Sequence, residues 1–568
     1  MKLYKTRSDS HQPKPYSDHR HHQNKIPPED INHRDCKRGV LLLLILVAIL
    51  MNLMALVFVS RLLKDSQLFN GFSAVVSDAG SNPPIPPKED NLPERPEEVP
   101  KLDKLLGGLL DPRFNERSCL SRYESVQYLK ELKRRPSPSL ISKLRSYEAL
   151  HRRCGPYTKS YNKTVELLTS GERPFAGTDC KYVIWIPFNG LGNRILSLAS
   201  AFLYAIVTNR VILVAPMDHV PDLFCEPFPG TSWFLPVDFP VTGYFNGFEK
   251  NSGFCYGNLV KNNLIDKSKI PPFIFLNLKY DMDRYDQLFF KDEEQKFLQK
   301  IPWLCMKSDQ YFIPYLFLMQ SFKKDVENMF PDKDSVFHLL GRYLFHPTNP
   351  VWKLIIRYHQ AYLAGADEKI GIQVRVFYNE PGLFKHVLDQ IISCTMSENI
   401  LPLINIDEDP KSNIGKKNTN KTKAVLITSL NSWYADVIRD MYLQYSTETG
   451  EVIRVHQPSH EERQKENDGL HYAKALAEMY LLGMSDRLVT SGESTFGYVA
   501  QGLGGLRSWV LYKPENRTAP DPPCGPFVSV EPCFHSPPLD SYTAAALVPH
   551  VRPCEDRIRG LKLYPDIK

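Results

Sequence analysis

The alternation of apolar and polar positions predicts a strand–helix unit that begins at Tyr182. YVIWIP is typical of a buried strand, NGLGNR at residues 189–194 is a glycine-rich turn, ILSLASAFLYAIVT is an apolar helix, and VILVAP is a second strand. In such a unit the turn brings backbone N–H groups and the positive end of the helix to the carboxyl edge of a parallel sheet, where anions bind. The turn is therefore a candidate anion site, although its glycines also suit simple helix–strand packing.

The same alternation returns between residues 371 and 491. Strand-like GIQVRVF, AVLITSL, EVIRVH and DRLVTS are separated by helical segments, which predicts a second doubly wound parallel sheet. The strand GIQVRVF, at residues 371–377, carries one arginine, Arg375, in a buried-type pattern. A guanidinium is expected there only at a strand end or beside an anion. Arg375 therefore forms a structural ion pair or binds an anionic ligand.

A helix is predicted directly after the last of these strands, with hydroxyl residues at its start. Ser494 and Thr495 can cap this helix, and the unpaired N–H groups of its first turn can hold a phosphate. A plain helix cap would need no ligand. Together with Arg375 and the NGLGNR turn, however, this helix start indicates one anion site between two domains.

The composition narrows the class of protein. The chain has 568 residues, of which 24% are charged and 42% hydrophobic, and its formal net charge is +6. Single cores stop growing at about 250–300 residues, so the length predicts two ordinary domains plus appendages. No lysine- or arginine-rich run lies beside aromatic repeats, which argues against nucleic acid as a partner.

Near its start the chain carries an apolar run of 20 residues, at positions 40–59, which is long enough to cross a bilayer as a helix. More lysine and arginine residues precede the run than follow it, so we expect a type II anchor at residues 40–60 with residues 1–39 in the cytosol. Seven prolines within residues 81–100 predict an extended spacer in a disordered stem. An anchor, a stem and a large lumenal body form the layout of Golgi enzymes that act on glycans.

The cysteines and glycosylation triplets agree with a lumenal body. Of the 11 cysteines, Cys36 precedes the anchor, and the other ten form an even number suited to disulfides, with no zinc-site spacing. Their pairing cannot be read from the sequence. The sequons at Asn162, Asn420 and Asn516 also follow the anchor.

A DxD triplet, formed by Asp281 and Asp283, follows the strand-like FIFLNLKY. Such a triplet can hold a divalent metal under a nucleotide diphosphate in a metal-dependent glycosyltransferase. The same pattern is common in solvated loops, and the charged neighbours Arg284, Asp286 and Asp292 favour that interpretation.

Five ordered stretches give the chain a family resemblance. NGLGNR, GIQVRVF, TSL followed by YADVIRD, STFGYVAQGLGG and ALVPHVRPCED are spread over residues 110–568 and resemble the plant cell-wall fucosyltransferases, the family that includes xyloglucan α-1,2-fucosyltransferase. The resemblance implies an α/β fold of GT-B type, in which two Rossmann-type lobes face a cleft. It also implies inverting transfer from GDP-β-L-fucose as donor substrate, with no cofactor and no metal.

The resemblance also assigns roles to residues. Arg375 matches the family's arginine that binds the nucleotide diphosphate, and a guanidinium can neutralise the charge on a departing diphosphate. The wider superfamily has a strand reading HxRR; here Gln373 replaces the histidine and only one arginine is present. The candidate nucleotide-binding residues are Asn189, Gly190, Gly192, Asn193, Arg194, Arg375, Ser494, Thr495, Phe496 and Gly497.

Inversion ordinarily requires a base that deprotonates the acceptor hydroxyl. Asp556 and Asp309 match family positions near the active site, and each is a candidate catalytic base or a ligand of sugar hydroxyls, with Asp556 ranked first. A loose transition state with water carrying the proton stays open. Aromatic groups that sugar recognition could use include Trp233, Trp303 and Tyr311.

We therefore expect a Golgi fucosyltransferase that adds L-fucose to O2 of a galactose on a plant cell-wall glycan. Xyloglucan is the first candidate acceptor and arabinogalactan side chains are the second; a non-catalytic glycan-binding or scaffold protein is the alternative of another class. A homodimer and a complex with other Golgi glycosyltransferases are both compatible with the sequence. The predicted divisions are a tail (1–39), an anchor (40–60), a stem (61–105), an acceptor-side lobe (106–365), a GDP-fucose-binding lobe (366–520) and a C-terminal segment that contributes to the active site (521–568).

Overall fold

The computed structural model describes residues 103–129, 134–170, 180–217, 219–376, 384–406, 421–514, 516–538 and 548–566, all within one compact unit, Glu98–Lys568. The predicted tail and anchor, and the stem as far as residue 102, lie outside the described residues. Among the residues that are described, no helix combines the length and the apolar character needed to span a bilayer.

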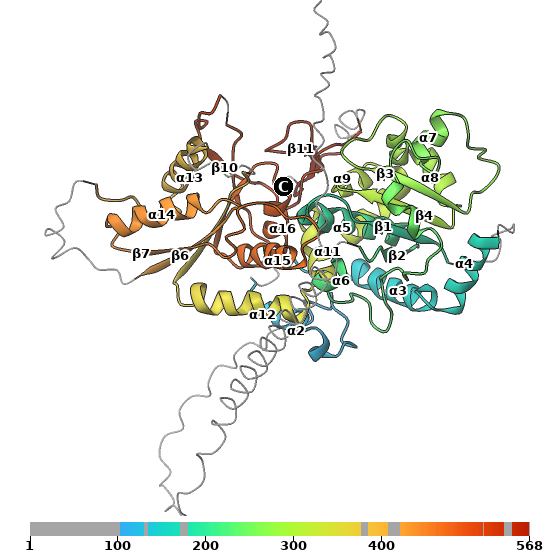
Figure 1. The fold of residues 1–568 in the computed structure, drawn as a ribbon, viewed down its shortest axis with the longest axis horizontal. Helices are drawn as coiled ribbons and strands as arrows, with labels where there is room; N and C mark the ends of the chain where they lie inside the picture. The colour runs from blue at the N-terminus through green and yellow to red at the C-terminus, as the bar shows by residue number, and fades with distance from the viewer. Residues whose placement is uncertain are drawn as a thin grey trace, which may run out of the picture. The chain divides into compact units, whose positions relative to one another are not determined.

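Two separate sheets, both mostly parallel, organise the chain (Figure 1). The first has the order β2-β1-β4-β3, and the second has the order β10-β9-β8-β5-β6-β7, in which only β10 runs antiparallel to its neighbour. The strands are β1 Tyr182–Ile186, β2 Val211–Val214, β3 Phe273–Leu278, β4 Trp303–Ser308, β5 Glu368–Gln373, β6 Thr422–Thr428, β7 Val452–His456, β8 Arg487–Ser491, β9 Trp509–Leu511 and β10 Cys524–Pro526, followed by a separate antiparallel pair, β11 Val551–Pro553 and β12 Leu561–Leu563. The predicted α/β fold with two parallel sheets is confirmed.

Helices cover the sheets, and several of them begin with a side chain that caps the first turn. Pro138 begins α3 and Ser137 caps it by accepting from the Leu140 N–H; Asp468 caps α15 in the same way. The α-helices are α2 Leu120–Glu124, α3 Pro138–Cys154, α4 Lys159–Ser170, α5 Leu191–Val207, α6 Val220–Leu223, α7 Tyr256–Lys261, α8 Asp292–Leu298, α9 Ile313–Leu316, α10 Gln320–Met329, α11 Val336–Leu344, α12 Asn349–Tyr358, α13 Lys385–Ser397, α14 Trp433–Gln444, α15 Gly469–Gly483 and α16 Thr495–Gly504.

Helix α5 joins the two sheets into one core. Almost every residue of α5 is buried, and the helix packs against α11, α15 and α16, which lie with it between the sheets (Figure 1). A helix that is apolar on all sides needs such a fully enclosed position. Because α5 follows β1 and α16 follows β8, their contact brings the carboxyl edges of the two sheets together.

Strand β5 is shorter than predicted, and this corrects the position of Arg375. The strand ends at Gln373, and the Arg375 N–H leaves the ladder to donate to the Ser491 hydroxyl at 2.9 Å. Arg375 therefore lies just beyond the strand rather than within it. Phe377, the last residue of the predicted strand, is outside the described residues.

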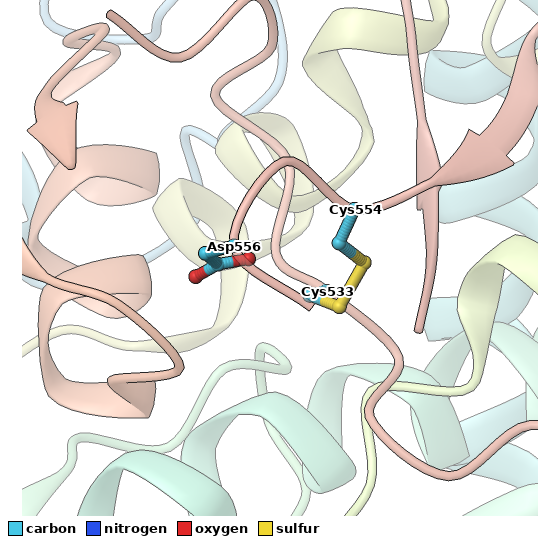
Figure 2. Close-up of side chains that lie close together, drawn as sticks. All are labelled: Cys533, Cys554 and Asp556. Atoms are coloured by element: carbon cyan, nitrogen blue, oxygen red, sulfur yellow. A yellow bond between two sulfur atoms is a disulfide. The ribbon is translucent and has the colours of Figure 1, made fainter. Parts of the chain in front are cut away.

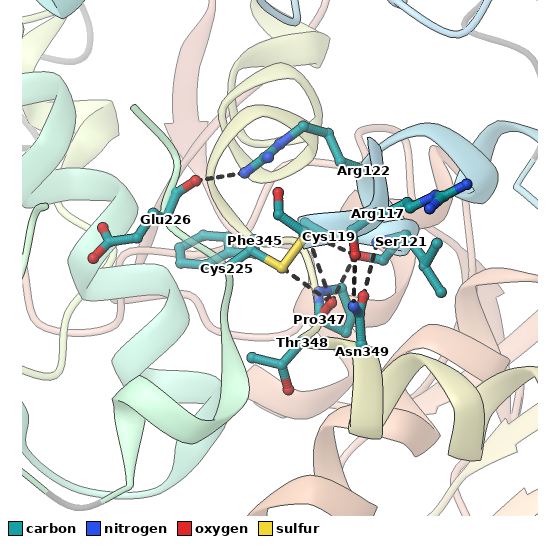
Figure 3. The surroundings of a disulfide bond; sticks show 12 residues. Arg117, Cys119, Ser121, Arg122, Cys225, Glu226, Phe345, Pro347, Thr348 and Asn349 are labelled. Carbon is teal, nitrogen blue, oxygen red and sulfur yellow. Dashed lines mark hydrogen bonds between the residues drawn. A yellow bond between two sulfur atoms is a disulfide. The ribbon is translucent and has the colours of Figure 1, made fainter. Parts of the chain in front are cut away.

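Within the described part of the chain, four disulfides form; they pair Cys119 with Cys225, Cys154 with Cys180, Cys394 with Cys524, and Cys533 with Cys554. Figure 3 shows the first of them, where Ser121 donates to the Pro347 carbonyl just before α12, so that the α2 region is fastened to that turn.

The expectation that all ten cysteines pair is wrong for Cys255 and Cys305, which are buried and unbridged. Phe275 lies between them, because it bridges to Cys255 on one side and pairs with Cys305 on the other. Two strand spacings, about 10 Å, exceed the reach of a disulfide.

The C-terminal segment contributes a buried acid, Glu531, to the contact with the first lobe. Its Oε2 accepts from the Tyr311 hydroxyl at 2.6 Å and its Oε1 accepts from the Phe337 N–H at 2.9 Å. Burial raises the pKa of Glu531 to about 8, so the acid is protonated in the folded chain at neutral pH and below.

This raised pKa predicts that the contribution of Glu531 to stability is larger at mildly acidic pH than at pH 8. The folded state holds a proton that the unfolded state releases near its ordinary value of 4.5, so the stabilisation is complete below that pH and is lost as the pH approaches about 8. Thermal unfolding of wild type and of Glu531→Gln, which mimics the protonated acid, should show the Tm of wild type falling relative to that of the variant from pH 5 to pH 8, by about 2–4 °C for each kcal/mol lost. A Tm difference between the two proteins that does not change with pH would contradict the assignment.

Candidate active site

A cavity of about 220 Å³ lies where the two sheet edges meet. Its walls come from the turn before α5, the ends of β5 and β6, the loop after β7, helix α15 and the start of α16. The lining residues are Asn189, Gly190, Leu191, Gly192, Asn193, Gln373, Val374, Arg375, Val376, Thr428, Ser429, Leu430, Ser459, Glu461, Gln464, His471, Tyr472, Lys474, Ala475, Glu478, Met479, Ser494, Thr495 and Phe496.

Most of the predicted nucleotide-binding residues meet in this cavity. Of that set, only Arg194 and Gly497 lie outside the lining, and both of them support it from behind. The Arg194 Nε donates to the Asn189 carbonyl at 2.7 Å, and its guanidinium lies 5.0 Å from the centre of the Tyr472 ring. Gly497 packs so closely on Thr490 that an added Cβ would lie 3.0 Å from that side chain.

The starts of α5 and α16 touch each other at the cavity. A Cβ added to Gly192 would lie 2.8 Å from the Thr495 carbonyl carbon and 2.9 Å from the Phe496 nitrogen, so only glycine permits this approach. The Thr495 hydroxyl donates to Asn193 Oδ1 at 2.5 Å across the same junction. Two helix N-termini therefore converge, and the N–H groups of their first turns have no partners within their own helices. Such a place attracts an anion.

Arg375 lies beside the start of α16. Its guanidinium donates to the Glu493 carbonyl at 2.8 Å, which fixes the side chain against the loop between β8 and α16. Although the residue as a whole is exposed, desolvation of the guanidinium lowers its pKa, the Arg557 charge acts in the same direction, and Glu493 opposes both. An arginine nevertheless stays protonated at neutral pH. The cavity thus has one fixed positive charge next to two helix N-termini.

The cavity also has a polar floor, in which sequence reasoning missed Thr428 and Glu478. Gln373 Oε1, Thr428 Oγ1 and Glu478 Oε1 are buried and lack a hydrogen-bond partner within the described part of the chain. Gln373 and Thr428 are paired neighbours on β5 and β6, and Glu478 faces the cavity from α15. Burial raises the pKa of Glu478 to about 7, although a hydrogen bond with Ser459 opposes the shift. Buried polar atoms without partners indicate a ligand that supplies them.

The loop after β7 is held over the cavity by Glu461. This buried carboxylate pairs with Lys465 at 2.9 Å, with Lys474 at 2.5 Å and with His471 at 3.2 Å. Gln464 in the same loop approaches the turn of the other lobe, since its Nε2 lies 3.8 Å from a Cβ built on Gly190. The apolar run of α15 predicted a helix, and nothing in that pattern marked its one acid, Glu478, as a site residue.

Asp309 does not line the cavity. Its carboxylate is buried, accepting from the Tyr280 N–H at 2.9 Å and from Gln310 Nε2 at 2.7 Å through Oδ1, and from Asn189 Nδ2 at 3.1 Å through Oδ2. Burial raises the pKa of Asp309, while its bonds to Gln310 and Asn189 lower it. The geometry is that of a residue which fixes the NGLGNR turn.

Asp556 is also absent from the cavity lining. Its Oδ2 accepts from the Glu493 N–H at 2.8 Å and from the Tyr498 hydroxyl at 2.5 Å, while its Oδ1 is buried without a hydrogen bond among the described residues. His535 Nε2 lies 3.2 Å from the same Tyr498 oxygen, and burial lowers the pKa of this histidine to about 3, so it is neutral. The network fixes the loop that carries Arg375's partner carbonyl.

Two possible metal sites have structural explanations. Asp556 lies close to Cys533 and Cys554, but these cysteines form a disulfide and so offer no thiolate (Figure 2). In the DxD triplet, Asp283 Oδ1 accepts from the N–H groups of Tyr285 and Asp286, and Asp281 lies 3.8 Å from the Lys279 ammonium. Both arrangements are typical of a loop that is stabilised by its own side chains.

The three aromatic residues suggested for sugar recognition are core residues. Trp233, Trp303 and Tyr311 are buried to within 1% of full enclosure. Trp303 stacks on Tyr182 with ring centres 4.0 Å apart, and the Tyr311 hydroxyl binds Glu531. A sugar cannot reach them, which corrects that expectation.

Comparison with known proteins gives concordant matches. A model of the xyloglucan fucosyltransferase family matches residues 85–542. The chain is 58% identical over 467 residues to a galactoside 2-alpha-L-fucosyltransferase of Pisum sativum, with 81% of this chain and 82% of that protein covered. It is 53% identical over 506 residues to a galactoside 2-alpha-L-fucosyltransferase of Arabidopsis thaliana, with 88% of each covered. A solved structure of a mutant of Arabidopsis thaliana FUT1 in complex with GDP is 55% identical, with a TM-score of 0.75 over 81% of this chain and all of that one.

Proposed function

Because the chain belongs to the xyloglucan fucosyltransferase family, we propose that it transfers L-fucose from GDP-β-L-fucose to O2 of a galactose on a plant cell-wall glycan. The observation that carries this proposal is the cavity where Arg375 and the starts of α5 and α16 converge. A diphosphate fits beside Arg375 and the two helix starts, and a nucleoside fits against the unpaired polar atoms of Thr428 and Glu478. The arrangement of two α/β lobes around one cavity is of the GT-B type.

The proposed chemistry follows from where the charges lie. As the bond between the fucose and the diphosphate breaks, negative charge grows on the leaving group, and the Arg375 guanidinium and the helix N-termini stabilise it. An acceptor hydroxyl attacks from the opposite face, which inverts the β-linked donor to an α-linked product. Asp556 Oδ1 is the first candidate for the proton from that hydroxyl and water is the second, whereas both oxygens of Asp309 are already engaged.

Glu478 supports guanine as the base of the donor. Guanine presents two neighbouring donors, N1–H and the 2-amino group, and a carboxylate can accept both. Apolar Leu430, Ala475 and Met479 line the cavity around this acid and suit the faces of a purine.

We therefore expect Glu478→Gln to weaken GDP binding by about tenfold or more, because an amide nitrogen would oppose the N–H groups of the base. The effect should be smaller for IDP, which lacks the 2-amino group. Isothermal titration with both nucleotides checks this, and an equal loss for GDP and IDP would contradict the role. Arg439→Ala, on the surface of α14 and outside the cavity lining, is the control and should change affinity little.

We further propose that xyloglucan is the acceptor, with arabinogalactan side chains as the alternative, and that the protein is a type II Golgi membrane protein anchored by residues 40–60. The family description and the apolar run support these assignments. Assembly as a homodimer or with other Golgi glycosyltransferases is compatible with them.

The function is tested with the purified full chain, GDP-fucose, and a panel of xyloglucan and arabinogalactan oligosaccharides. Mass spectrometry should show one added fucose, and linkage analysis should place it on O2 of galactose. Failure to modify every galactose-terminated acceptor would favour a glycan-binding protein. Adding EDTA should leave the rate unchanged, whereas loss of activity restored by manganese would favour the metal-dependent alternative that uses Asp281 and Asp283.

A further inference from the structure

Tyr280 is an exposed aromatic residue at the same sheet edge as the cavity. It lies two residues beyond the end of β3, and 62% of its surface is accessible, whereas Trp233, Trp303 and Tyr311 are buried. Single exposed aromatic residues are common on protein surfaces, so exposure alone indicates nothing. The contacts that hold Tyr280 are what distinguish it.

A buried carboxylate ties Tyr280 to the cavity. Asp309 Oδ1 accepts the Tyr280 N–H at 2.9 Å, and Asp309 Oδ2 accepts from Asn189, which lines the cavity, at 3.1 Å. Asp309 is only 4% exposed, so this bridge is shielded from water and rigid. The position of Tyr280 is thereby fixed relative to the site where the donor is proposed to bind.

The strand order sets how far Tyr280 lies from the turn that lines the cavity. Asn189 follows β1 and Tyr280 follows β3, and β4 lies between these strands. Two strand spacings separate the two residues by about 10 Å along the edge. This separation suits contact with a sugar beyond the reacting galactose rather than with the galactose itself.

The surroundings of Tyr280 resemble a sugar-binding surface, which needs an apolar face and polar groups at its rim. Phe188, which follows β1 at the same sheet edge, is half-buried, with the ammonium groups of Lys279, the neighbour of Tyr280, and of Lys307 lying 4.8 Å and 5.4 Å from its ring centre. Both lysines pair with Glu249, whose side chain is 51% exposed and can accept from hydroxyl groups. An exposed aromatic face next to exposed polar groups suits a neutral oligosaccharide.

We propose that Tyr280 is a binding platform for the acceptor glycan, contacting a sugar unit outside the galactose that receives fucose. The inference rests on the proposed fucosyltransferase function and adds the place where the acceptor chain lies. Asp309 is then a positioning residue that holds this platform and the donor-side turn in register.

The test compares long and short acceptors in the full-length enzyme. Tyr280→Ala should raise KM for a galactosylated xyloglucan oligosaccharide by about tenfold, because one aromatic contact is lost. The values of kcat and of KM for GDP-fucose should stay within about twofold, and a minimal β-galactoside acceptor should show no change in kcat/KM. Tyr280→Phe keeps the ring and should behave as wild type.

Tyr157→Ala is the matched control, since Tyr157 is 74% exposed and lies in the turn between α3 and α4, outside the cavity lining. Calorimetry of oligosaccharide binding with GDP present needs no turnover. It therefore tests the Tyr280 platform separately from the proposed fucosyltransferase function. If wild type transferred no fucose but Tyr280→Ala still bound the oligosaccharide more weakly, the platform would be retained and the proposed fucosyltransferase function would be overturned. Unchanged oligosaccharide binding and KM in Tyr280→Ala, or an equal loss with the minimal galactoside, would overturn the platform.

Discussion

Arg375→Ala is expected to lower kcat for fucose transfer by about 10²–10³-fold. Arg375 is the fixed positive charge beside the start of α16, and charge develops on the departing diphosphate at that point; loss of one preorganised donor of this kind has an effect of that size. GDP affinity should fall as well, because the product carries the same charge. Steady-state kinetics and calorimetry with GDP measure the two effects.

The comparison with Arg375→Lys separates charge from geometry. Lysine keeps the charge but has no planar fork, so it should recover part of the lost rate. Arg439→Ala serves as the control, because Arg439 lies on α14, pairs with Asp436 on the surface, and is absent from the cavity lining. Normal turnover by Arg375→Ala would remove this residue from the mechanism, whereas loss of thermal stability in parallel would point to a structural role.

Gly192→Ala is expected to damage both stability and donor binding. In an unconstrained helix this change would stabilise by about 0.5–1 kcal/mol, because glycine is the more flexible residue. Here the new Cβ would lie 2.8 Å from the Thr495 backbone, so the starts of α5 and α16 must separate. Overpacking of this kind costs about 1–3 kcal/mol. The N–H groups around the proposed diphosphate site would move apart, so KM for GDP-fucose should rise together with a lower Tm.

Gly365→Ala is the matched control, since a Cβ added there meets no atom of the described chain within 4 Å. That variant should keep the Tm and the KM of wild type. If Gly192→Ala behaved like the control, the close contact between the two helix starts would be refuted. A lower Tm of Gly192→Ala with an unchanged KM for GDP-fucose would support the contact between the two helix starts but would show that it has no part in donor binding.

The two α/β units could be predicted because their signals are local. Buried-type strands such as the one starting at Tyr182, the glycine turn after it, and the hydroxyl cap at Ser494 are each contained in a few consecutive residues. Strand β4 escaped detection, although it lies inside the first sheet between β1 and β3. Its sequence, WLCMKS, is short and ends in polar residues, so neither alternation nor a long apolar run marks it.

The roles of single side chains could not be predicted in the same way, because the burial of a side chain depends on the packed molecule. Asp309 and Asp556 are candidate bases by sequence, and neither lines the cavity: Asp309 fixes the NGLGNR turn, and Asp556, whose Oδ1 stays the first proposed base, also supports the loop before α16. Trp303 was a candidate sugar contact and is a core residue, whereas Tyr280, which the sequence did not single out, is exposed at the carboxyl edge. No periodicity distinguishes these cases, since each depends on which segments cover the residue.

The sequence by itself determined the strand–helix order, the glycine turn, the helix caps and the resemblance to fucosyltransferases. Only the tertiary structure decided that Gln373, Thr428 and Glu478 share one floor, that Gly192 touches Thr495, and which eight cysteines pair. The physical reason is the distance along the sequence over which each interaction acts. Turns and caps depend on neighbours a few positions away, whereas the cavity exists because α5 and α16, about 300 positions apart, are packed start to start.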